Sequence, residues 1–400
     1  MSDLEVESEE RFFDPDMTEL VQLRRALHRI PELSFRERET SALLQEHVGR
    51  WAKGLRVVAN TGFWVDLGDM VHADRRILLR ADMDGLPIQE ETGLAYASTS
   101  PGRMHACGHD AHMAALAVAG RLLSEAPPQG VAVRLLFQPA EEGGGGARAC
   151  IEEGALDGID IAFGIHVWNE LPLGTVALTH GGIMAGVVEL GFTVHGQGGH
   201  GAIPHRTRDP VVASAQLIMA LQTVASRRFA PVEPIVVSVG SIHGGDAFNV
   251  IPHTVELRGT VRGFSEAVIG DIEEAVRAIA AGVEVATGTR IEVHWKLSTR
   301  PTVNNVRVAE MARHAAKERM VGVETVLTDY RTMAGEDFGE ILRVVPGCFA
   351  LVGSANPARG LVEPHHSPRF EIDEAALRVA CDLHRAVVAE YADGGLARAR

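Results

Sequence analysis

Short apolar segments that lead into acidic or imidazole side chains recur along the chain, and this recurrence limits the fold more than any other feature. There are three of them: Arg76–Ala81 leads into Asp82 and Asp84, Val131–Phe137 into Glu141 and Glu142, and Ile161–Ile165 into His166. Runs of this length and composition predict buried strands, and open α/β sheets carry their sites at the carboxyl ends of such strands. The pattern therefore predicts an α/β protein with a polar site at one edge of a sheet.

Each acidic pair also has a simpler interpretation. Asp82 and Asp84 precede Gly85 and a proline, so they could cap a turn. Glu141 and Glu142 could be acids favoured by the dipole at a helix N-terminus, which explains one glutamate better than two. The turn interpretation stays open for the aspartates, but chance capping would have to recur at every one of these strand ends to explain the whole pattern.

The stretch Met104–His112 carries a dense group of metal-ligand atoms: three histidines, one cysteine and one aspartate. Cys107 and His109 are two residues apart, so in an extended loop their side chains project to the same side. A thiolate together with an imidazole favours a transition metal. A helical segment from Ala111 to Leu123 follows, and its dipole is expected to favour the thiolate form of the cysteine. The alternative is a loop with scattered histidines and one reduced cysteine.

The composition is that of a globular protein and excludes several classes of partner. The chain has 400 residues, which favours two domains over one. Its net charge of -15 argues against nucleic acid and anionic membranes as partners, but not against divalent metals. The 4 cysteines are irregularly spaced, which predicts free thiols in a reducing compartment. Residues 1–16 lack the features of a secretory signal, and no segment reaches membrane-spanning length, so we expect a cytoplasmic protein.

The middle of the chain predicts a second, inserted domain. Within residues 184–297 the expected order is strand, helix, two strands, helix and strand, which forms a compact α+β unit. The first of these strands leads into a glycine-rich loop, residues 196–205. The flanking residues 15–183 and 298–395 have α/β character, so we expect them to form one discontinuous domain.

The motifs, in their order along the chain, resemble those of the binuclear-metal aminoacylase/carboxypeptidase superfamily. The similarity runs from His28-x-x-Pro31-Glu32 through Cys107-Gly108-His109 and Glu141-Glu142 to His366-Ser367-Pro368. It is strongest to the subgroup of hippurate hydrolases, N-acyl-amino-acid amidohydrolases and indole-acetyl-amino-acid hydrolases. The resemblance implies an α/β catalytic domain with a central mixed β-sheet flanked by helices, and a smaller inserted α+β domain that serves as lid and dimerisation domain.

The resemblance also implies roles for residues of the catalytic domain. It implies that two divalent metal ions per subunit are bound by Cys107, His109, Glu142, His166 and His366. Glu141 corresponds to the general base, and Asp84 to an aspartate that supports the ligands. Asp82 stands where the wider superfamily has a histidine ligand, so Asp82 is not assigned as a ligand.

In the inserted domain the resemblance implies a homodimer whose subunits share their active sites. His200 corresponds to a histidine that reaches into the partner's site, and a histidine in a glycine-rich loop is expected to be mobile. The alternative is that His200 only bonds its own loop, with His205 as a second solvent-facing histidine. Asn249 and Arg258 correspond, more loosely, to positions that bind substrate.

The implied reaction is hydrolysis of the amide bond of an N-acyl amino acid, with an N-acetyl, N-benzoyl or similar group, to a carboxylate and a free amino acid. Glu141 would take a proton from the attacking water and return it to the leaving amine. Two alternatives remain: a metallopeptidase on the same scaffold, either a dipeptidase or a carboxypeptidase, and a non-catalytic metal-binding protein. The unligated Glu141 argues against the last. The donor atoms do not choose among Mn, Zn, Co and Ni.

Overall fold

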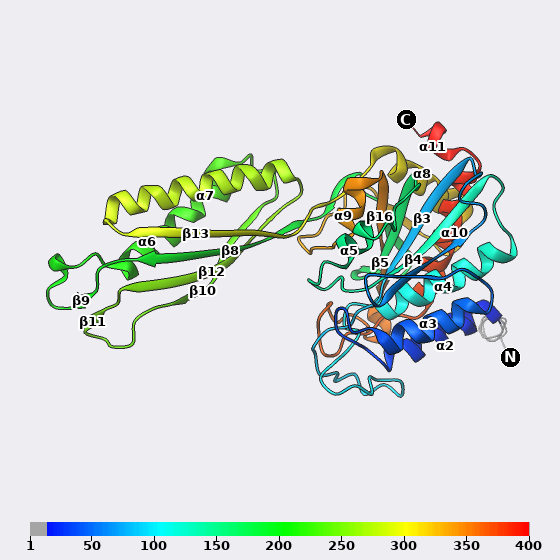
Figure 1. Cartoon of the computed structure of the whole chain (residues 1–400), viewed down its shortest axis with the longest axis horizontal. Helices are drawn as coiled ribbons and strands as arrows, with labels where there is room; N and C mark the ends of the chain where they lie inside the picture. Colours follow the sequence, from blue (N-terminus) through cyan, green and yellow to red (C-terminus); the bar gives the residue numbers. More distant parts are fainter. Residues whose placement is uncertain (1–13, 400) are drawn as a thin grey trace. The chain divides into compact units, whose positions relative to one another are not determined.

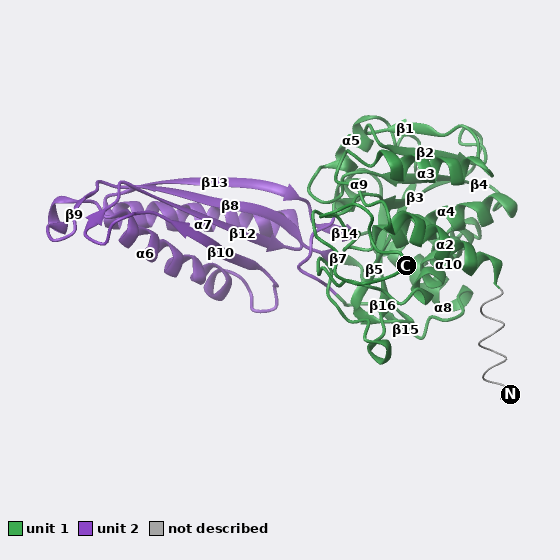
Figure 2. Ribbon diagram, turned by 90° about the horizontal axis from the view of Figure 1, so that it is seen from below, with its two compact units in different colours: residues 1–181, 304–330, 337–400 green, residues 182–303, 331–336 purple. Residues whose placement is uncertain are grey.

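The computed structural model describes residues 14–399. Most of residues 1–16, which we expect to lack a secretory signal, therefore lies outside the described residues. The chain divides into two compact units (Figure 2). Unit 1 comprises Met1–Gly181, Asn304–Tyr330 and Asp337–Arg400, and unit 2 comprises Gly182–Val303 and Arg331–Glu336. Arg331–Glu336 thus groups with unit 2, although the sequence placed it with the flanking domain. Within residues 14–399, no helix combines the length and the apolar character that a membrane crossing needs.

Unit 1 is built on a mixed sheet, which has 8 strands in the described part of the chain (Figure 1). In sheet order the strands are β1 (Arg56–Val58), β2 (Gly62–Leu67), β4 (Val131–Gln138), β3 (Arg75–Asp82), β5 (Ile161–Pro172), β16 (Gly347–Ala355), β6 (Thr175–Ala177) and β15 (Thr325–Leu327). The central strands β4, β3, β5 and β16 are parallel to one another. All residues of β4 and β16 are buried, as expected for strands covered on both faces. The carboxyl ends of these four strands therefore meet at one edge.

Helices cover both faces of this sheet. One face carries α2 (Pro15–His28), α3 (Arg38–Gly49), α4 (His109–Glu125), α8 (Val306–Arg319) and α10 (Ala375–Ala392), and the other carries α5 (Gly146–Glu152) and α9 (Phe338–Val344). Neighbouring residues of β5 show the two faces, because side chains alternate along a strand. Phe163 contacts His384 of α10, whereas a Cβ atom on Gly164 would lie 3.0 Å from Phe338 of α9. Two short helices, η3 (Pro357–Arg359) and α11 (Gly395–Arg398), complete the unit.

Unit 2 contains an antiparallel sheet with two helices on one face (Figure 1). Its strand order is β10 (Val236–His243), β12 (Thr254–Gly263), β8 (Gly186–His195) and β13 (Arg290–Thr299), and its helices are α6 (Pro210–Thr223) and α7 (Glu266–Thr287). The shorter elements are β9 (Gly199–His200), η1 (Pro204–Arg206), η2 (Val224–Arg228) and β11 (Val250–Ile251), with β7 (Gly181–Met184) and β14 (Thr302–Asn304) at its borders in the sequence. Every second residue of β8 is buried against the helices. The α+β order expected from the sequence is present, but α7 runs to Thr287 where an end at Ala281 was expected.

A buried network of charged side chains ties α2 to the start of α4. Arg24 Nε donates to Asp110 Oδ2 at 3.0 Å, and His28 Nδ1 lies 2.8 Å from the same oxygen. His28 Nε2 lies 3.3 Å from Glu90 Oε1. Both ring nitrogens of His28 therefore face carboxylate oxygens, and only the imidazolium form has two donors. Burial lowers the pKa of His28, but Asp110 and Glu90 outweigh it and raise the pKa to about 9.

We predict that His28 stabilises the metal-free protein at neutral pH and that this effect disappears at alkaline pH. The pKa of an unfolded histidine is about 6.5. The stabilisation is therefore complete below that pH and is lost as the pH rises through the folded-state value of about 9. The free energy of unfolding of wild type minus that of His28→Gln, measured with chelator present, should fall by roughly 3 kcal/mol across this range. Other titrating groups cancel in the difference, so a constant difference would contradict the charged state of His28.

Candidate metal centre

The segment that carries Cys107 and His109 is shaped by Gly108, the N-cap of α4. Gly108 has a φ of 86°, and a Cβ atom on it would lie 2.5 Å from Val167 Cγ2. Both the backbone conformation and the packing therefore require glycine. The turn leaves Cys107 just before the helix and His109 as its first residue, two residues earlier than the sequence predicted. Both side chains are buried.

Three overlapping groups of ligand atoms surround this turn. They are Cys107 with His109 and His166, Cys107 with Glu142 and His366, and His109 with Glu141 and Glu142. Within each group the ligand atoms all lie within 4.8 Å of one another. The structure thus brings together the residues that the resemblance implied as metal ligands and, beside them, the implied base.

The imidazoles of His109 and His166 are each oriented by a backbone carbonyl. His109 Nδ1 lies 2.8 Å from Asp84 O, and His166 Nδ1 lies 2.6 Å from Val167 O. Each neutral ring therefore carries its proton on Nδ1 and directs the lone pair of Nε2 into the group. His166 Nε2 lies 3.4 Å from Cys107 Sγ. His109 Nε2 is fully buried, yet it has no hydrogen-bond partner among the described residues.

A divalent transition metal fits this arrangement. His109 Nε2 is a polar atom buried without a hydrogen-bond partner among the described residues, and such an atom is costly to leave unpaired whether or not it carries a proton. Nitrogen, sulfur and carboxylate oxygen donors converge on the same place, which is the donor set that such ions prefer. The backbone carbonyls that hold the rings are the outer contacts typical of metal-binding histidines.

Asp84 supports several of these residues at once. Its Oδ1 accepts a hydrogen bond from Glu141 N at 3.0 Å, and its Oδ2 accepts from Glu142 N at 3.0 Å and from Ser34 Oγ at 2.8 Å. Its backbone oxygen holds His109, as described above. The turn interpretation of this aspartate is therefore insufficient, because one residue just beyond β3 orients both glutamates and a histidine.

Glu142 and His366 meet although they are far apart in the sequence. Glu142 Oε1 is buried without a hydrogen-bond partner among the described residues and lies 3.3 Å from His366 Nε2. The backbone N–H of His366 donates to Ala106 O at 2.8 Å, which places it beside Cys107. His366 has a φ of 65°, a left-handed conformation that is unfavourable with a Cβ and persists where the surroundings impose it.

Asp82 and His112 also lie near His109, but their atoms are used elsewhere. His112 Nδ1 lies 2.6 Å from Asp82 Oδ1, and His112 Nε2 accepts from Val167 N at 2.9 Å. The other oxygen of Asp82 accepts from Arg80 Nη1 at 2.6 Å. These groups come within ligand distance of His109, but the lone pair of His112 Nε2 is already used by Val167 N, and each oxygen of Asp82 already accepts one hydrogen bond.

The expectation that His166 ends a strand is wrong. β5 continues through His166 to Pro172, because its pairing with β16 continues. Its pairing with β3, however, stops at Gly164. His166 therefore lies two residues beyond the part of β5 that β3 covers, close to the edge where β3 ends.

The surroundings of Cys107 and His109 favour the protonated form of both side chains when no metal is bound. Burial raises the pKa of the Cys107 thiol well above its usual range, and Glu142 and Glu141 raise it further. Burial lowers the pKa of His109, but Asp82 and Asp84 outweigh this and raise it to about 10. The expectation that the helix dipole favours the thiolate is therefore wrong for the metal-free state, because desolvation and nearby carboxylates outweigh the dipole.

We predict that metal binding near pH 7.5 releases roughly two protons per subunit, because a metal binds the thiolate and the neutral imidazole. Calorimetric titrations in buffers with different ionisation enthalpies measure this number. Cys107→Ala, titrated at saturating metal, should release about one proton fewer. Metal binding without proton release would contradict the protonated state of both side chains.

In unit 2, His200 and Asn249 lie close together. β9 pairs with β11, which places His200 opposite Val250, and Gly201 N donates to Asn249 O at 2.8 Å. His200 thus belongs to a short ladder, which the sequence did not predict. Arg258 lies in the middle of β12, exposed, and no hydrogen bond or ion pair joins it to His200 or Asn249 within residues 14–399. The structure groups His200 with Asn249 and does not bring Arg258 to them.

The sequence did not identify Asp337 and Arg80 as residues that contribute to the site. Asp337 N donates to Glu141 Oε1 at 3.3 Å, and the fully buried Arg80 bonds the side chain of Asp337 at 2.9 Å. A signal was present for the arginine, because it interrupts an apolar strand and a buried charge needs a partner. The identity of that partner depends on tertiary structure.

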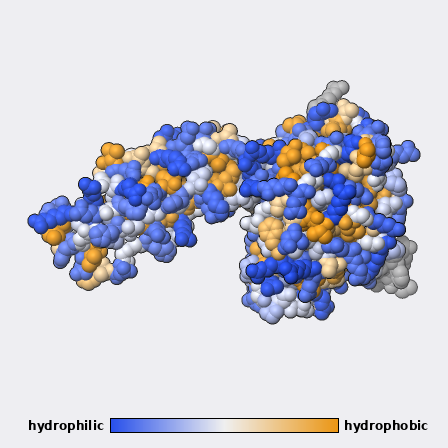
Figure 3. All heavy atoms as spheres, in the orientation of Figure 1, coloured by the Kyte–Doolittle hydropathy of each residue, from blue (hydrophilic) through white to orange (hydrophobic). Residues whose placement is uncertain are grey.

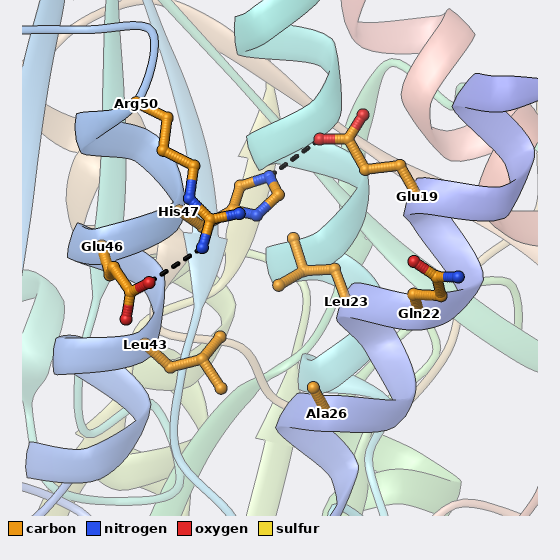
Figure 4. A pocket seen from close by; sticks show the side chains of 8 residues that line it. All are labelled: Glu19, Gln22, Leu23, Ala26, Leu43, Glu46, His47 and Arg50. Atoms are coloured by element: carbon orange, nitrogen blue, oxygen red, sulfur yellow. Dashed lines mark hydrogen bonds and ion pairs between the residues drawn. The ribbon is translucent and has the colours of Figure 1, made fainter.

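A surface cavity of about 390 Å³ lies between α2 and α3 (Figure 4). Glu19 and His47 pair across it at 2.9 Å, and Glu46 pairs with Arg50 on its rim. Its charged side chains are thus already paired, and none of the predicted site residues lines it.

Residues 78–390 match the sequence profile of peptidase family M20/M25/M40. The chain belongs to this family. An N-acetyl-L-cysteine deacetylase of Bacillus subtilis (strain 168) is 40% identical over 361 residues, which cover 90% of this chain and 85% of that protein. Thermostable carboxypeptidase 1 of Saccharolobus solfataricus is 34% identical over 381 residues, which cover 94% of this chain and 95% of that protein.

A solved structure of a Bacillus subtilis protein, described as a dinuclear metal-binding peptidase of the M20 family, has the same fold. It aligns with a TM-score of 0.82 and 32% identity, over 94% of this chain and 99% of that chain. The family resemblance and the α/β fold expected from the sequence are therefore confirmed, and the chain is a member of a family of hydrolases.

Proposed function

We propose that this member of the M20 family is a metal-dependent amidohydrolase that cleaves N-acyl amino acids into a carboxylate and a free amino acid. The observation that carries the proposal is the convergence of the thiol, imidazole and carboxylate ligand atoms around Cys107 with Glu141 beside them. The similarity to an N-acetyl-L-cysteine deacetylase over most of both chains supports the substrate class.

The proposed metal-binding residues are Cys107, His109, Glu142, His166 and His366. Two divalent ions bound there would supply Lewis acidity, which lowers the pKa of water and polarises an amide carbonyl. The thiol of Cys107 favours softer ions, and the other donors tolerate Mn, Zn, Co and Ni alike.

Glu141 is the proposed general base. The N–H of Asp337 holds its Oε1 at 3.3 Å, and its Oε2 lies 4.0 Å from His109 Nε2. In this position its carboxylate takes a proton from the water that attacks the amide carbonyl. It then gives that proton to the amine nitrogen as the C–N bond breaks. Asp84 fixes the backbone of this glutamate, so the base is oriented before substrate binds.

A metallopeptidase is the second candidate, because a thermostable carboxypeptidase is 34% identical over nearly the whole chain. The two candidates differ in whether the substrate carries a free α-amino group. Turnover of N-acetyl, N-benzoyl and N-indoleacetyl amino acids, compared with that of dipeptides of the same amino acids, separates them. Faster cleavage of the dipeptides would favour the peptidase.

We predict that Glu141→Gln and Glu142→Gln inactivate the enzyme in different ways. Glu141→Gln should keep its metal content but hydrolyse N-acyl amino acids about two or more orders of magnitude more slowly, because a positioned base is lost. Glu142→Gln should lose metal, because a ligand oxygen is replaced by an amide. Elemental analysis and steady-state rates measure the two effects.

Chelation of the wild type and add-back of each metal provide the control for this pair. Full hydrolysis by a chelated, metal-free sample would refute the metal-dependent reaction. Loss of metal from Glu141→Gln, with retention by Glu142→Gln, would exchange the roles of the two glutamates.

We also propose that the protein is a cytoplasmic homodimer formed through unit 2, and that His200 acts in the partner's site. His200 Nδ1 accepts from Ala202 N at 3.1 Å, so the neutral ring carries its proton on Nε2, which can donate to an oxyanion.

The surface of unit 2 supports the proposed dimer. Val211, Val212 and Met219 on α6 are 44%, 51% and 71% exposed, and exposed apolar side chains of this kind support an interface. Figure 3 shows hydrophobic residues on the visible surface of unit 2. The cytoplasmic location is supported by the four cysteines, because all of them are free thiols, as expected in a reducing compartment.

Subunit mixing tests the action in trans. His200→Ala and Glu141→Gln should each be inactive while folded and metal-loaded. After subunit exchange, half of the dimers are mixed, and each mixed dimer has one site with both groups intact if His200 comes from the partner. We therefore expect roughly a quarter of wild-type activity. No recovery despite demonstrated exchange would mean that His200 acts in its own chain or not at all.

A further inference from the structure

The turn that carries the proposed base is held by three buried carboxylates from distant parts of unit 1. Glu37 Oε1 accepts from Ala140 N at 2.9 Å, Asp84 accepts from Glu141 N and Glu142 N at 3.0 Å each, and Asp337 Oδ2 accepts from Ala147 N at 2.9 Å. Residues 140–147 are therefore fixed through their backbone N–H groups at the start, in the middle and at the end.

This turn needs such anchors because its backbone is unfavourable in isolation. Ala140 has a φ of 56°, in the left-handed region that costs a residue with a Cβ roughly 1–2 kcal/mol. At the other end, a Cβ atom on Gly146 would lie 1.6 Å from Pro139 O, so the chain folds back tightly on itself. Without external contacts, the turn and the glutamate on it would relax.

Asp337 contacts both the turn and the base. Its side chain bonds Ala147 N, and its own backbone N–H donates to Glu141 Oε1 at 3.3 Å. Its carboxylate in turn accepts from Arg80 Nη2 at 2.9 Å and from Gln138 Nε2 at 2.9 and 3.0 Å. Asp337, Arg80 and Gln138 are all buried, so these contacts are shielded from water.

We propose that Asp337 is a positioning residue for the general base, and that Arg80 and Gln138 hold its carboxylate for this purpose. The carboxylate fixes where the N–H of Asp337 meets Glu141, and through Ala147 it fixes the end of the turn. The proposal rests on the proposed function, since Glu141 must be the base. Asp337 then acts on the rate only through Glu141.

The chemistry of the contacts explains why an aspartate is needed. Every side-chain contact of Asp337 described above comes from a donor, and both of its oxygens accept. An asparagine has nearly the same shape, but its amide nitrogen must face one of these donors. Asp337→Asn should therefore keep the fold while it weakens the hold on the turn.

The test is a kinetic double-mutant cycle on the metal-loaded enzyme with an N-acyl amino acid as substrate. Asp337→Asn should keep the wild-type metal content and a KM within about twofold, with a kcat roughly 10- to 100-fold lower, because a displaced base slows the chemical step. In the Glu141→Gln background the same substitution should lower kcat by about twofold at most, since the group that it positions is already absent.

The matched control is Asp66→Asn. Asp66 accepts from Arg134 at 2.7 and 2.9 Å in the same sheet, and neither of these hydrogen bonds involves residues 140–147. The melting temperature of the Asp66→Asn variant should fall, while its kcat stays unchanged. Gln138→Met, which removes one donor to Asp337 and leaves the aspartate in place, should reproduce the pattern with a kcat loss of roughly 3- to 10-fold. It also serves as the decisive variant if Asp337→Asn does not fold.

The possible failures are distinguishable. An equal loss of kcat in both backgrounds, a loss of metal, or wild-type kcat in both Asp337→Asn and Gln138→Met would overturn the positioning role and leave the proposed function intact. Wild-type kcat in Glu141→Gln would instead overturn the proposed base, and the positioning role with it.

Discussion

The hydrogen bonds of one buried carboxylate, Asp84, are the interaction on which the arrangement of the site depends. Burial raises the pKa of Asp84, but the contact with His109 and the N–H of Glu142 outweigh this and keep the pKa below its usual range. The charge of Asp84 is thus stabilised by the groups that it orients. The carboxylate holds the two glutamates through their backbone N–H groups, and the backbone oxygen of the same residue holds the imidazole of His109.

The parallel order of the central strands explains why those segments meet. β4, β3, β5 and β16 run in the same direction, so their carboxyl ends lie at one edge. Asp84 follows β3, the two glutamates follow β4, and His166 lies on β5 beyond its pairing with β3. Cys107 and His166, for example, are 59 positions apart in the sequence, and Cys107 Sγ lies 3.4 Å from His166 Nε2.

The sequence predicted these strands and the residues at their ends, because apolar runs and local motifs are features of the chain itself. It did not predict that His166 lies inside β5, because that depends on the register between β3, β5 and β16. The protonated Cys107 was missed because desolvation depends on burial, which only the folded chain defines. Asp337 was missed for a related reason: its partner Arg80 is 257 positions away.

The buried acids at this edge of the sheet form hydrogen bonds mainly with backbone N–H groups. Glu37, Asp84 and Asp337 direct their oxygens at backbone N–H groups, so the turn that carries Glu141 and Glu142 is held by atoms of the protein itself. The imidazoles are likewise set by carbonyl oxygens. Because these supports use none of the atoms that we propose as metal ligands, we expect them to persist when an ion binds. With Cys107 and His109 as the proposed ligands, what has to change on binding is chiefly the protons on these two side chains, so metal and protons would compete for the same atoms.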